Sequence, residues 1–230
     1  MTNIKPAGVV QQAVDAGAAK AATSSGQLVH RGVLGGALLG CTTSFAVLAA
    51  VEKRATWAAV LRYSLMVILG HMIGALAFAF LFSVALNGFG TTDPGPLGQQ
   101  FAATAEAKTL EYQAMGIAGI GTVFVKAMLC NWLVCLGVFM GLTSKDTVGK
   151  IAAIWLPIMV FYGLGFEHAV VNFFMIPMGM FMGADVSIAD WWLWNQIPVL
   201  LGNFVGGFVF TGLALLRAFR PAPKEVPAHH

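Results

Sequence analysis

The chain has 230 residues, of which 58% are hydrophobic and only 10% are charged, whereas soluble proteins average about 25% charged residues. So little polar surface would not cover a soluble protein of this size, and we therefore expect an all-α integral membrane protein in a lipid bilayer. The net charge of +3 is small and the basic residues are scattered among loops, which excludes nucleic acid as an expected partner. The three cysteines lie in apolar segments and indicate neither a disulfide framework nor a metal site, and we expect no cofactor.

The first 30 residues precede any long apolar run. Val9, Val10, Ala13 and Val14 fall on one face of a helix, so residues 1–30 are expected to form an amphipathic surface helix. No continuous apolar stretch follows a basic start, and no cleavable signal peptide is expected.

Five apolar stretches follow, each near or above the roughly 20 residues that cross a bilayer. They cover about 32–51, 58–87, 114–142, 151–184 and 193–216. Between the second and third, the long polar connector 88–113 carries turn residues and a short helix expected over 99–113 near the surface. The sequence thus predicts one transmembrane domain over 31–217 and a solvated cytoplasmic tail over 218–230.

Two of these stretches resemble each other. LGHMIGALAFAFLF (69–82) and LGNFVGGFVFTGLAL (201–215) both begin with Leu-Gly, a polar residue and a second glycine before an apolar run. The two glycines in each, four residues apart, have the spacing that lets membrane helices pack closely. Such a likeness between two halves of a membrane protein is typical of the internal repeats of transporters.

The basic residues raise a question of topology. They gather at the N-terminus, over 53–62, over 145–150 and in the tail, whereas the connectors 88–113 and 184–190 are acidic or nearly so. The positive-inside rule places the basic connectors in the cytoplasm. A single crossing over 32–51 would then put the basic N-terminus outside. Either this stretch does not cross, or one crossing is missing from the chain.

The stretch 151–184 carries two ionisable side chains at its centre, Glu167 and His168. One helix over this stretch would measure about 51 Å, which exceeds a hydrocarbon core of roughly 30 Å. Gly163 and Gly165 precede the pair, and a proline lies on either side of it at Pro157 and Pro177. We therefore expect a helix interrupted near mid-membrane, with non-helical backbone facing a cavity or the protein interior.

Ionisable groups inside a membrane are costly enough to indicate a function, although this pair could also serve only helix packing. His168 is the candidate proton carrier, because an imidazole changes its charge near neutral pH and could attract or protonate a small anion. Glu167 would repel an anion and is expected to orient its neighbours. Lys126, the second buried charge, either snorkels to an interface, adds positive potential to an anion route or pairs with Glu167.

Other polar residues in the apolar stretches are candidates for the same site. Asn172 and Asn203 could each line a pore as a donor or hold two helices together. His71 occupies the position in the first repeat that Asn203 holds in the second. Because His71 and His168 both lie mid-span, a membrane subunit with haem between them is a further alternative.

At these residues the chain resembles the formate/nitrite transporter family of small-anion channels. The likeness rests on FVKAMLCNWLVCLGVFMG (124–141), GFEHAVVNFFMIPMG (165–179) and IPVLLGNFVGG (197–207), and on two N-terminal stretches. The resemblance implies a homopentamer with one pore per subunit and an aquaporin-like helical bundle of six spans in two inverted repeats. It also implies a multi-pass protein of the inner (plasma) membrane of a bacterium.

The resemblance also assigns roles to individual residues. His168 would be the central pore histidine, with Glu167 beside it and Asn172 one helical turn further on. Asn203 would be the amide that approaches this histidine from the last span. Phe161, which spacing alone would place in the core or against lipid, would match a phenylalanine of the cytoplasmic constriction. Lys126 would be the basic residue of the fourth span.

The chain departs from the family in two places. Family members carry a second broken helix before the stretch that corresponds to 54–78, whereas here 39–51 leads straight into it, so about five spans are expected. Thr42 and Thr43 are candidates to replace the loop threonine that the absent helix would supply. His71 stands where the family usually has an asparagine.

These features predict a passive or proton-coupled channel for small monovalent anions such as formate or nitrite, and not an enzyme. Moving a carboxylate-sized ion into a medium of low dielectric constant costs on the order of 20 kcal/mol. Lys126 would lower that barrier electrostatically, and His168 could remove it by protonating the anion. The other candidate is a shortened homologue that assembles in the pentamer without conducting.

Overall fold

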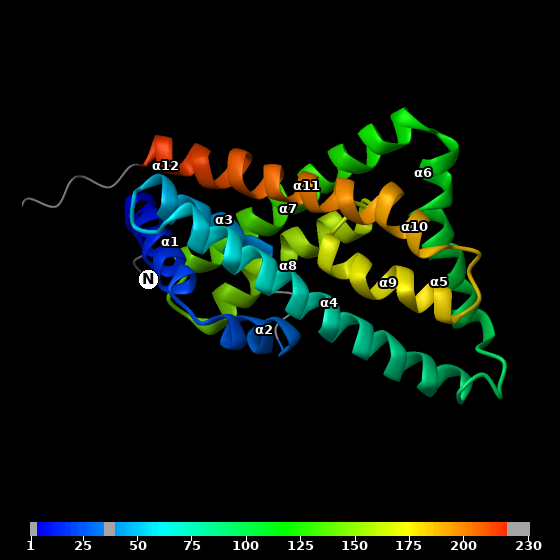
Figure 1. The fold of residues 1–230 in the computed structure, drawn as a ribbon. Helices are drawn as coiled ribbons and strands as arrows, with labels where there is room; N and C mark the ends of the chain where they lie inside the picture. The colour runs from blue at the N-terminus through cyan, green and yellow to red at the C-terminus, as the bar shows by residue number, and fades with distance from the viewer. Residues whose placement is uncertain (1–3, 35–39, 220–230) are drawn as a thin grey trace, which may run out of the picture.

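The computed structural model describes residues 4–34 and 40–219, with residues 32–34 and 40–44 described by their backbone alone. Every regular element in these ranges is a helix, which confirms the predicted all-α class (Figure 1). The helices are α1 (Pro6–Ala21), α2 (Ser25–Leu34), α3 (Gly40–Val51), α4 (Trp57–Asn87), α5 (Gly95–Ala107), α6 (Leu110–Ala114), α7 (Ile117–Thr143), α8 (Thr147–Gly163), α9 (Ala169–Phe181), α10 (Ile188–Trp191), α11 (Ile197–Val205) and α12 (Ala214–Ala218). Two π-helical turns, η1 (Trp192–Gln196) and η2 (Gly206–Leu213), join the last three helices into one run.

Three helical runs in the described ranges are long and apolar enough to cross a bilayer: α4, α7 and the run from α10 to α12. They agree with the predicted stretches 58–87, 114–142 and 193–216. Figure 1 shows all three extending along the length of the molecule. The connector after α4 forms α5 and α6 rather than the single short helix expected over 99–113.

The predicted interruption of 151–184 is present. α8 ends at Gly163 and α9 begins at Ala169, and Gly165 between them has a φ of 63°, in the left-handed region that favours glycine. Pro157 and Pro177 lie inside α8 and α9, so neither proline makes the interruption, and α8 ends at Gly163. α8 and α9 each have fewer residues than a bilayer crossing needs, and together they flank the segment that carries Glu167 and His168.

The first predicted stretch, 32–51, takes a different form, with α2 and α3 on either side of the gap in the described ranges. Arg62 in the second turn of α4 donates to Ala21 O (2.9 Å) and Thr23 O (2.8 Å), which places the start of α2 beside the start of α4. α3 ends at Val51, and Arg54 N donates to Ala49 O (2.7 Å), so the end of α3 leads directly into α4. α2 and α3 are about 15 and 18 Å long, roughly half the thickness of a bilayer core.

Both ends of this segment therefore lie at one end of the molecule, which agrees with the alternative that this stretch does not cross. Ile4 N donates to Thr143 O (3.3 Å), so the beginning of the described chain lies beside the end of α7. The basic connectors at 52–56 and 144–146 and the end of α12 lie at this same end (Figure 1). We call it the basic end. Asp185 N donates to Glu106 Oε1 (3.1 Å) at the opposite end, where the acidic connectors meet.

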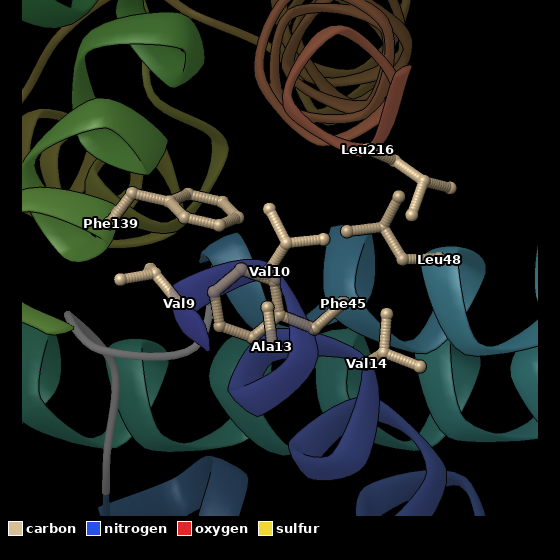
Figure 2. Close-up of a cluster of buried hydrophobic side chains, with 8 residues drawn as sticks. All are labelled: Val9, Val10, Ala13, Val14, Phe45, Leu48, Phe139 and Leu216. Carbon is tan, nitrogen blue, oxygen red and sulfur yellow. The ribbon is translucent and has the colours of Figure 1, made fainter. Parts of the chain in front are cut away.

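The apolar face predicted for residues 1–30 packs against protein at the basic end. Four residues of α1 meet residues of α3, α7 and α12 in one buried cluster: Val9, Val10, Ala13, Val14, Phe45, Leu48, Phe139 and Leu216 (Figure 2). The rings of Phe45 and Phe139 meet edge to face, with centroids 5.2 Å apart. α1 thus holds α3, α7 and α12 together at the basic end. The division into a domain over 31–217 and flanking segments stays a prediction, and most of the tail lies outside the described ranges.

Close packing at the second glycine pair holds α11 against α7. A Cβ atom at Gly206 would lie 2.1 Å from Met128 O, and one at Gly202 would lie 2.5 Å from Phe124 O. No side chain fits at either position without moving α7, so the two backbones approach as the four-residue spacing predicts. This contact fixes the position of Asn203, which lies between the two glycines.

Candidate functional site

Glu167 is the most connected residue of the break between α8 and α9, and only 1% of it is exposed. Its Oε1 accepts a hydrogen bond from Tyr112 Oη (3.0 Å). Its Oε2 accepts from Lys108 Nζ (2.9 Å), from Asn172 Nδ2 (2.8 Å) and from Asn195 Nδ2 (3.3 Å). A buried carboxylate needs such donors and a nearby cation, because it has lost its water. The break is thereby bound to the α5–α6 region, to α9 and to η1.

Lys108 and Tyr112 reach the break because α5 turns back into the molecule alongside α9. A Cβ atom at Gly179 would lie 2.3 Å from the Cβ of Ala105, so α5 and α9 pack almost backbone to backbone. Lys108 is the first residue after α5, and Tyr112 lies in α6. Lys108 and Tyr112 therefore lie beside Glu167, and not on the surface where the polar connector was expected.

Lys126 is linked to Glu167 through Tyr112. The Lys126 ammonium donates to Tyr112 Oη (3.1 Å) and lies 5.4 Å from the centre of the tyrosine ring. Tyr112 Oη in turn donates to Glu167, so the direct Lys126–Glu167 pair considered from the sequence is replaced by a relay through one hydroxyl. The cation that pairs with Glu167 is Lys108.

Asn203 holds the backbone of the break. Its Nδ2 donates to Glu167 O (2.9 Å) and to Ala127 O (2.8 Å), and its Oδ1 accepts from Ala169 N (2.9 Å). Both amide hydrogens are used on carbonyl groups, so this side chain joins α11, α7 and the start of α9. Of the two roles considered for Asn203, the geometry favours holding helices together.

Asn172 makes a similar link between the break and η1. Its Nδ2 donates to Glu167 and also to Asn195 Oδ1 (2.8 Å). Asn195 Nδ2 donates to Lys108 O (2.8 Å), which closes a ring of polar contacts around the carboxylate. Asn172 is fully buried, and its own Oδ1 has no partner among the residues that the structure describes.

His168 is the residue immediately before α9, and 5% of it is exposed. Its ring stacks on Phe161 with centroids 5.8 Å apart and planes 21° from parallel. Its Nδ1 is buried, and within the described ranges it has no hydrogen-bond partner. The imidazole is thus held by an aromatic contact, and one of its hydrogen-bonding nitrogens is unused within the described part of the structure.

The His168 side chain borders two cavities. One has a volume of about 440 Å³ and is also lined by His71, Asn131 and Asn203, and we call it the His71 cavity. It reaches Trp57, the first residue of α4. Trp57 and His71 are about 21 Å apart along that helix, so the cavity runs from near the basic end to the break. Most of its other lining residues are apolar: Val47, Val60, Leu61, Leu65, Val67, Ile68, Ala169, Val170, Leu200, Leu201 and Phe204.

The second cavity, the Phe161 cavity, has a volume of about 380 Å³ and is bordered by Phe161, His168 and Lys108. A third cavity of about 570 Å³ contains Lys126 in its lining and is called the Lys126 cavity. The Phe161 and Lys126 cavities share four lining residues: Gln100, Thr104, Lys108 and Gly165. The Lys126 and Phe161 cavities therefore lie between the two lysines and His168. The His71 cavity extends from His168 towards the basic end.

The structure brings the residues predicted from the sequence into one region. Glu167, Asn172 and Asn203 share hydrogen bonds, and Lys126 joins through Tyr112. Phe161 stacks on His168, and His71 lines the same cavity as His168. These contacts place all seven predicted residues at or beside the break. The side chains of Thr42 and Thr43 lie outside the described part of the structure.

Five participants were missed from the sequence: Lys108, Tyr112, Asn131, Asn195 and Gln196, of which Gln196 donates from Nε2 to Ala169 O (3.2 Å) at the start of α9. Lys108 and Tyr112 belong to a polar connector, where a lysine and a tyrosine are ordinary surface residues. Asn195 and Gln196 are completely buried and lie within the predicted stretch 193–216. The rule that identified Asn203, an amide in an apolar stretch, would have identified these two as well.

The fold is that of a multi-pass membrane protein, and comparisons with known proteins give its family. Residues 41–217 match the family model described as formate/nitrite transporter. The chain is 38% identical over 169 residues to a probable formate transporter of Methanothermobacter thermautotrophicus, in an alignment that covers 70% of this chain and 60% of that protein. It is 31% identical over 204 residues to the formate channel FocA of Escherichia coli (strain K12), covering 79% and 67%. The chain belongs to the formate/nitrite transporter family, a family of transporters and channels and not of enzymes.

Solved structures agree at the level of the fold. A pentameric formate channel with formate bound superposes with a TM-score of 0.59 at 23% identity, covering 92% of this chain and 96% of that one. An ion channel of the same family superposes with a TM-score of 0.60 at 23% identity. The first two curated relatives are matched over only 60% and 54% of their length.

Proposed function

We propose that this protein is a channel or transporter for small monovalent anions of weak acids, in the class of formate and nitrite. Support comes from the family and from the formate transporters and channels among its relatives. The observation that carries the proposal is the position of His168, a buried imidazole at the break of a membrane helix that borders two cavities. No apolar packing requirement explains an ionisable ring at such a place.

The charges near the break suit an anion. Lys108 and Lys126 contribute two positive charges and Glu167 one negative charge, so these three groups together carry one net positive charge. Glu111 also borders the Lys126 cavity, but it is exposed, and water screens its charge. The partly buried lysines therefore lower the electrostatic cost of bringing an anion to the Phe161 cavity.

His168 then allows the anion to cross the apolar part of the route by protonating it. A protonated imidazole gives its proton to an oxygen of the anion, which leaves a neutral imidazole and a neutral acid. The neutral acid avoids most of the cost of charge transfer, on the order of 20 kcal/mol, in the largely apolar His71 cavity. The acid loses its proton in the water at the far side, and the imidazole regains one before the next passage.

We further propose that the chain works as a homopentamer in the inner membrane of a bacterium. The structural relative named above is a pentameric channel, which supports this assembly. Large apolar side chains remain exposed on α4 and α8, among them Leu81 (64%), Trp155 (59%) and Leu156 (56%). Such surfaces need lipid or a neighbouring subunit to cover them.

One structural feature favours a second candidate, a subunit that assembles without conducting. α2 and α3 begin and end at the basic end, so the predicted first span does not form a crossing in the described ranges. A haem held between His71 and His168 is a weaker alternative, and a purified protein without a Soret absorption band would dispose of it.

Formate flux into liposomes separates these candidates. The purified protein, reconstituted in phospholipid vesicles with an internal pH-sensitive dye, is expected to admit formate faster than protein-free vesicles. Size-exclusion chromatography of the same sample checks the assembly. Flux equal to that of empty vesicles from a correctly assembled oligomer would establish the non-conducting subunit instead.

A further inference from the structure

His71 and His168 approach one cavity from two different helices. Both side chains line the His71 cavity, and both residues are buried, with 3% and 5% of their surface exposed. Ile68 and Met72, which precede and follow His71 in α4, pack on the buried cluster that contains Phe173 of α9. His168 immediately precedes α9, and the two imidazoles are close enough to interact electrostatically. The cavity therefore holds two groups of the kind that changes charge near neutral pH.

The other polar side chains of this cavity do not exchange protons near neutral pH. Ser64 donates its hydroxyl hydrogen to Val60 O (2.9 Å). Asn131 donates to Asn203 O (2.6 Å), and both amide hydrogens of Asn203 are bonded to carbonyl groups. Hydroxyls and amides are not among the side chains that titrate in proteins. Among the described residues of the lining, His71 is therefore the one partner with which His168 can exchange a proton.

No charged side chain in the described ranges shares this lining with the two histidines. The segments of α3, α9 and α11 contain no charged or histidine residue. On α1, α2, α4, α7 and the break, the charged or histidine residues outside the lining are Asp15, Lys20, His30, Arg31, Arg62, Lys126 and Glu167. The charge that acts on His168 from within this cavity is thus that of His71. Two protonated rings in one buried space would repel each other, so we expect the pair to hold one proton at a time.

The cavity gives His71 a path to the basic end. Trp57, Ser64 and His71 follow one another at intervals of seven residues, about two helical turns, so they lie along one side of α4, and all three line the cavity. His71 is the last residue of α4 in this lining, about 10 Å beyond Ser64. Asn131 Oδ1 is buried, has no partner among the described residues and offers an acceptor to a water molecule in the cavity. Water that enters from the basic end can therefore bring protons to His71.

We propose that His71 is a second proton-carrying residue, which returns a proton to His168 after each molecule of acid has passed towards the basic end. An N–H bond of the protonated His71 ring breaks, a new N–H bond forms on the neutral His168 ring, and the positive charge moves from one ring to the other. His71 then regains a proton from the water at the basic end, where the acid has released one. The net cargo is thus the anion alone. This inference deepens the proposed function and rests on it for the passage of the acid.

Replacing the His71 ring by imidazole in solution tests this role. The full chain is reconstituted in phospholipid vesicles, and the entry of radiolabelled formate is followed at neutral pH. His71→Ala is expected to lower the rate by at least about tenfold, because His168 has lost its proton donor. Imidazole added on both sides of the membrane enters the enlarged cavity and is expected to restore most of the rate. Pyrazole, a ring of the same size that stays uncharged at neutral pH, is expected to restore none of it.

A second variant controls for folding. His71→Asn places an amide where the second repeat has Asn203, and it is expected to form the wild-type oligomer and yet to lose flux as His71→Ala does. His30→Ala, at an exposed histidine outside the cavity, is expected to keep the wild-type rate. Wild-type flux in His71→Ala, no restoration by imidazole, or equal restoration by pyrazole would overturn the role of His71 and leave the channel standing. A wild-type protein without formate flux would refute the channel itself, and this inference with it.

Discussion

At the scale of single residues, the carboxylate of Glu167 organises the break. It accepts hydrogen bonds from four side chains that come from three different parts of the chain. The sequence interpretation gave it the task of orienting its neighbours, and the contacts agree with that task. The same contacts make it a structural residue, because removing it leaves several buried donors without an acceptor.

We expect Glu167→Ala to destabilise the protein by about 3–5 kcal/mol, since it removes one partner of a buried ion pair. Glu167→Gln keeps the shape and one acceptor oxygen and is expected to cost less. Denaturant-induced unfolding in detergent measures both. Glu111→Ala is the matched control, because that carboxylate is exposed and its loss should stay within about 0.5 kcal/mol. Equal stability of Glu167→Ala and Glu111→Ala would refute this role.

The residues of the site were predictable to the extent that they were unusual for their surroundings. His168, Glu167, Asn172 and Asn203 are polar groups in apolar stretches, where physical cost alone singles them out. Lys108 was not predictable in this way, because a lysine in a polar connector costs nothing. Only the close packing of α5 on α9 carries it to the carboxylate, and that packing depends on contacts between residues far apart in the chain.

At the scale of helices, length and glycine content predicted the break between α8 and α9. A stretch too long for one crossing must bend or stop, and Gly163 and Gly165 mark where it stops. The form of 32–51 was not predictable from hydropathy, because its length fits an ordinary span. The distribution of basic residues indicated the unusual form of this stretch instead, because a single crossing would have conflicted with the positive-inside rule.

Labelling of single cysteines tests the arrangement of α2 and α3. In a cysteine-free background, Thr23→Cys and Lys145→Cys are expected to react with a membrane-impermeant maleimide from the same side of the membrane. Thr92→Cys, in the connector after α4, is expected to react from the opposite side. The reason is that α2 and α3 return to the basic end, whereas α4 crosses. Labelling of Thr23→Cys together with Thr92→Cys would show that the segment crosses once.

At the scale of the whole molecule, charge and cavities follow the length of the helices. The basic connectors gather at one end, the largely apolar His71 cavity runs inward from there, and His168 stands where that cavity reaches the break. Beyond it lie the Phe161 and Lys126 cavities with their two lysines. This order, from positive potential to a proton donor to an apolar passage, is what the passage of a weak acid requires.

The pH dependence of formate flux through His168→Phe is the measurement that tests the central claim most directly. Wild-type vesicles are expected to take up formate faster as the pH falls, because more of the imidazole is protonated. His168→Phe keeps a ring at this position but cannot carry a proton, so we expect flux at acidic pH to fall by at least about tenfold and to lose this pH dependence. The exposed His30 provides a matched control, and His30→Phe should behave as the wild type. A His168→Phe protein with an unchanged pH profile would contradict the account.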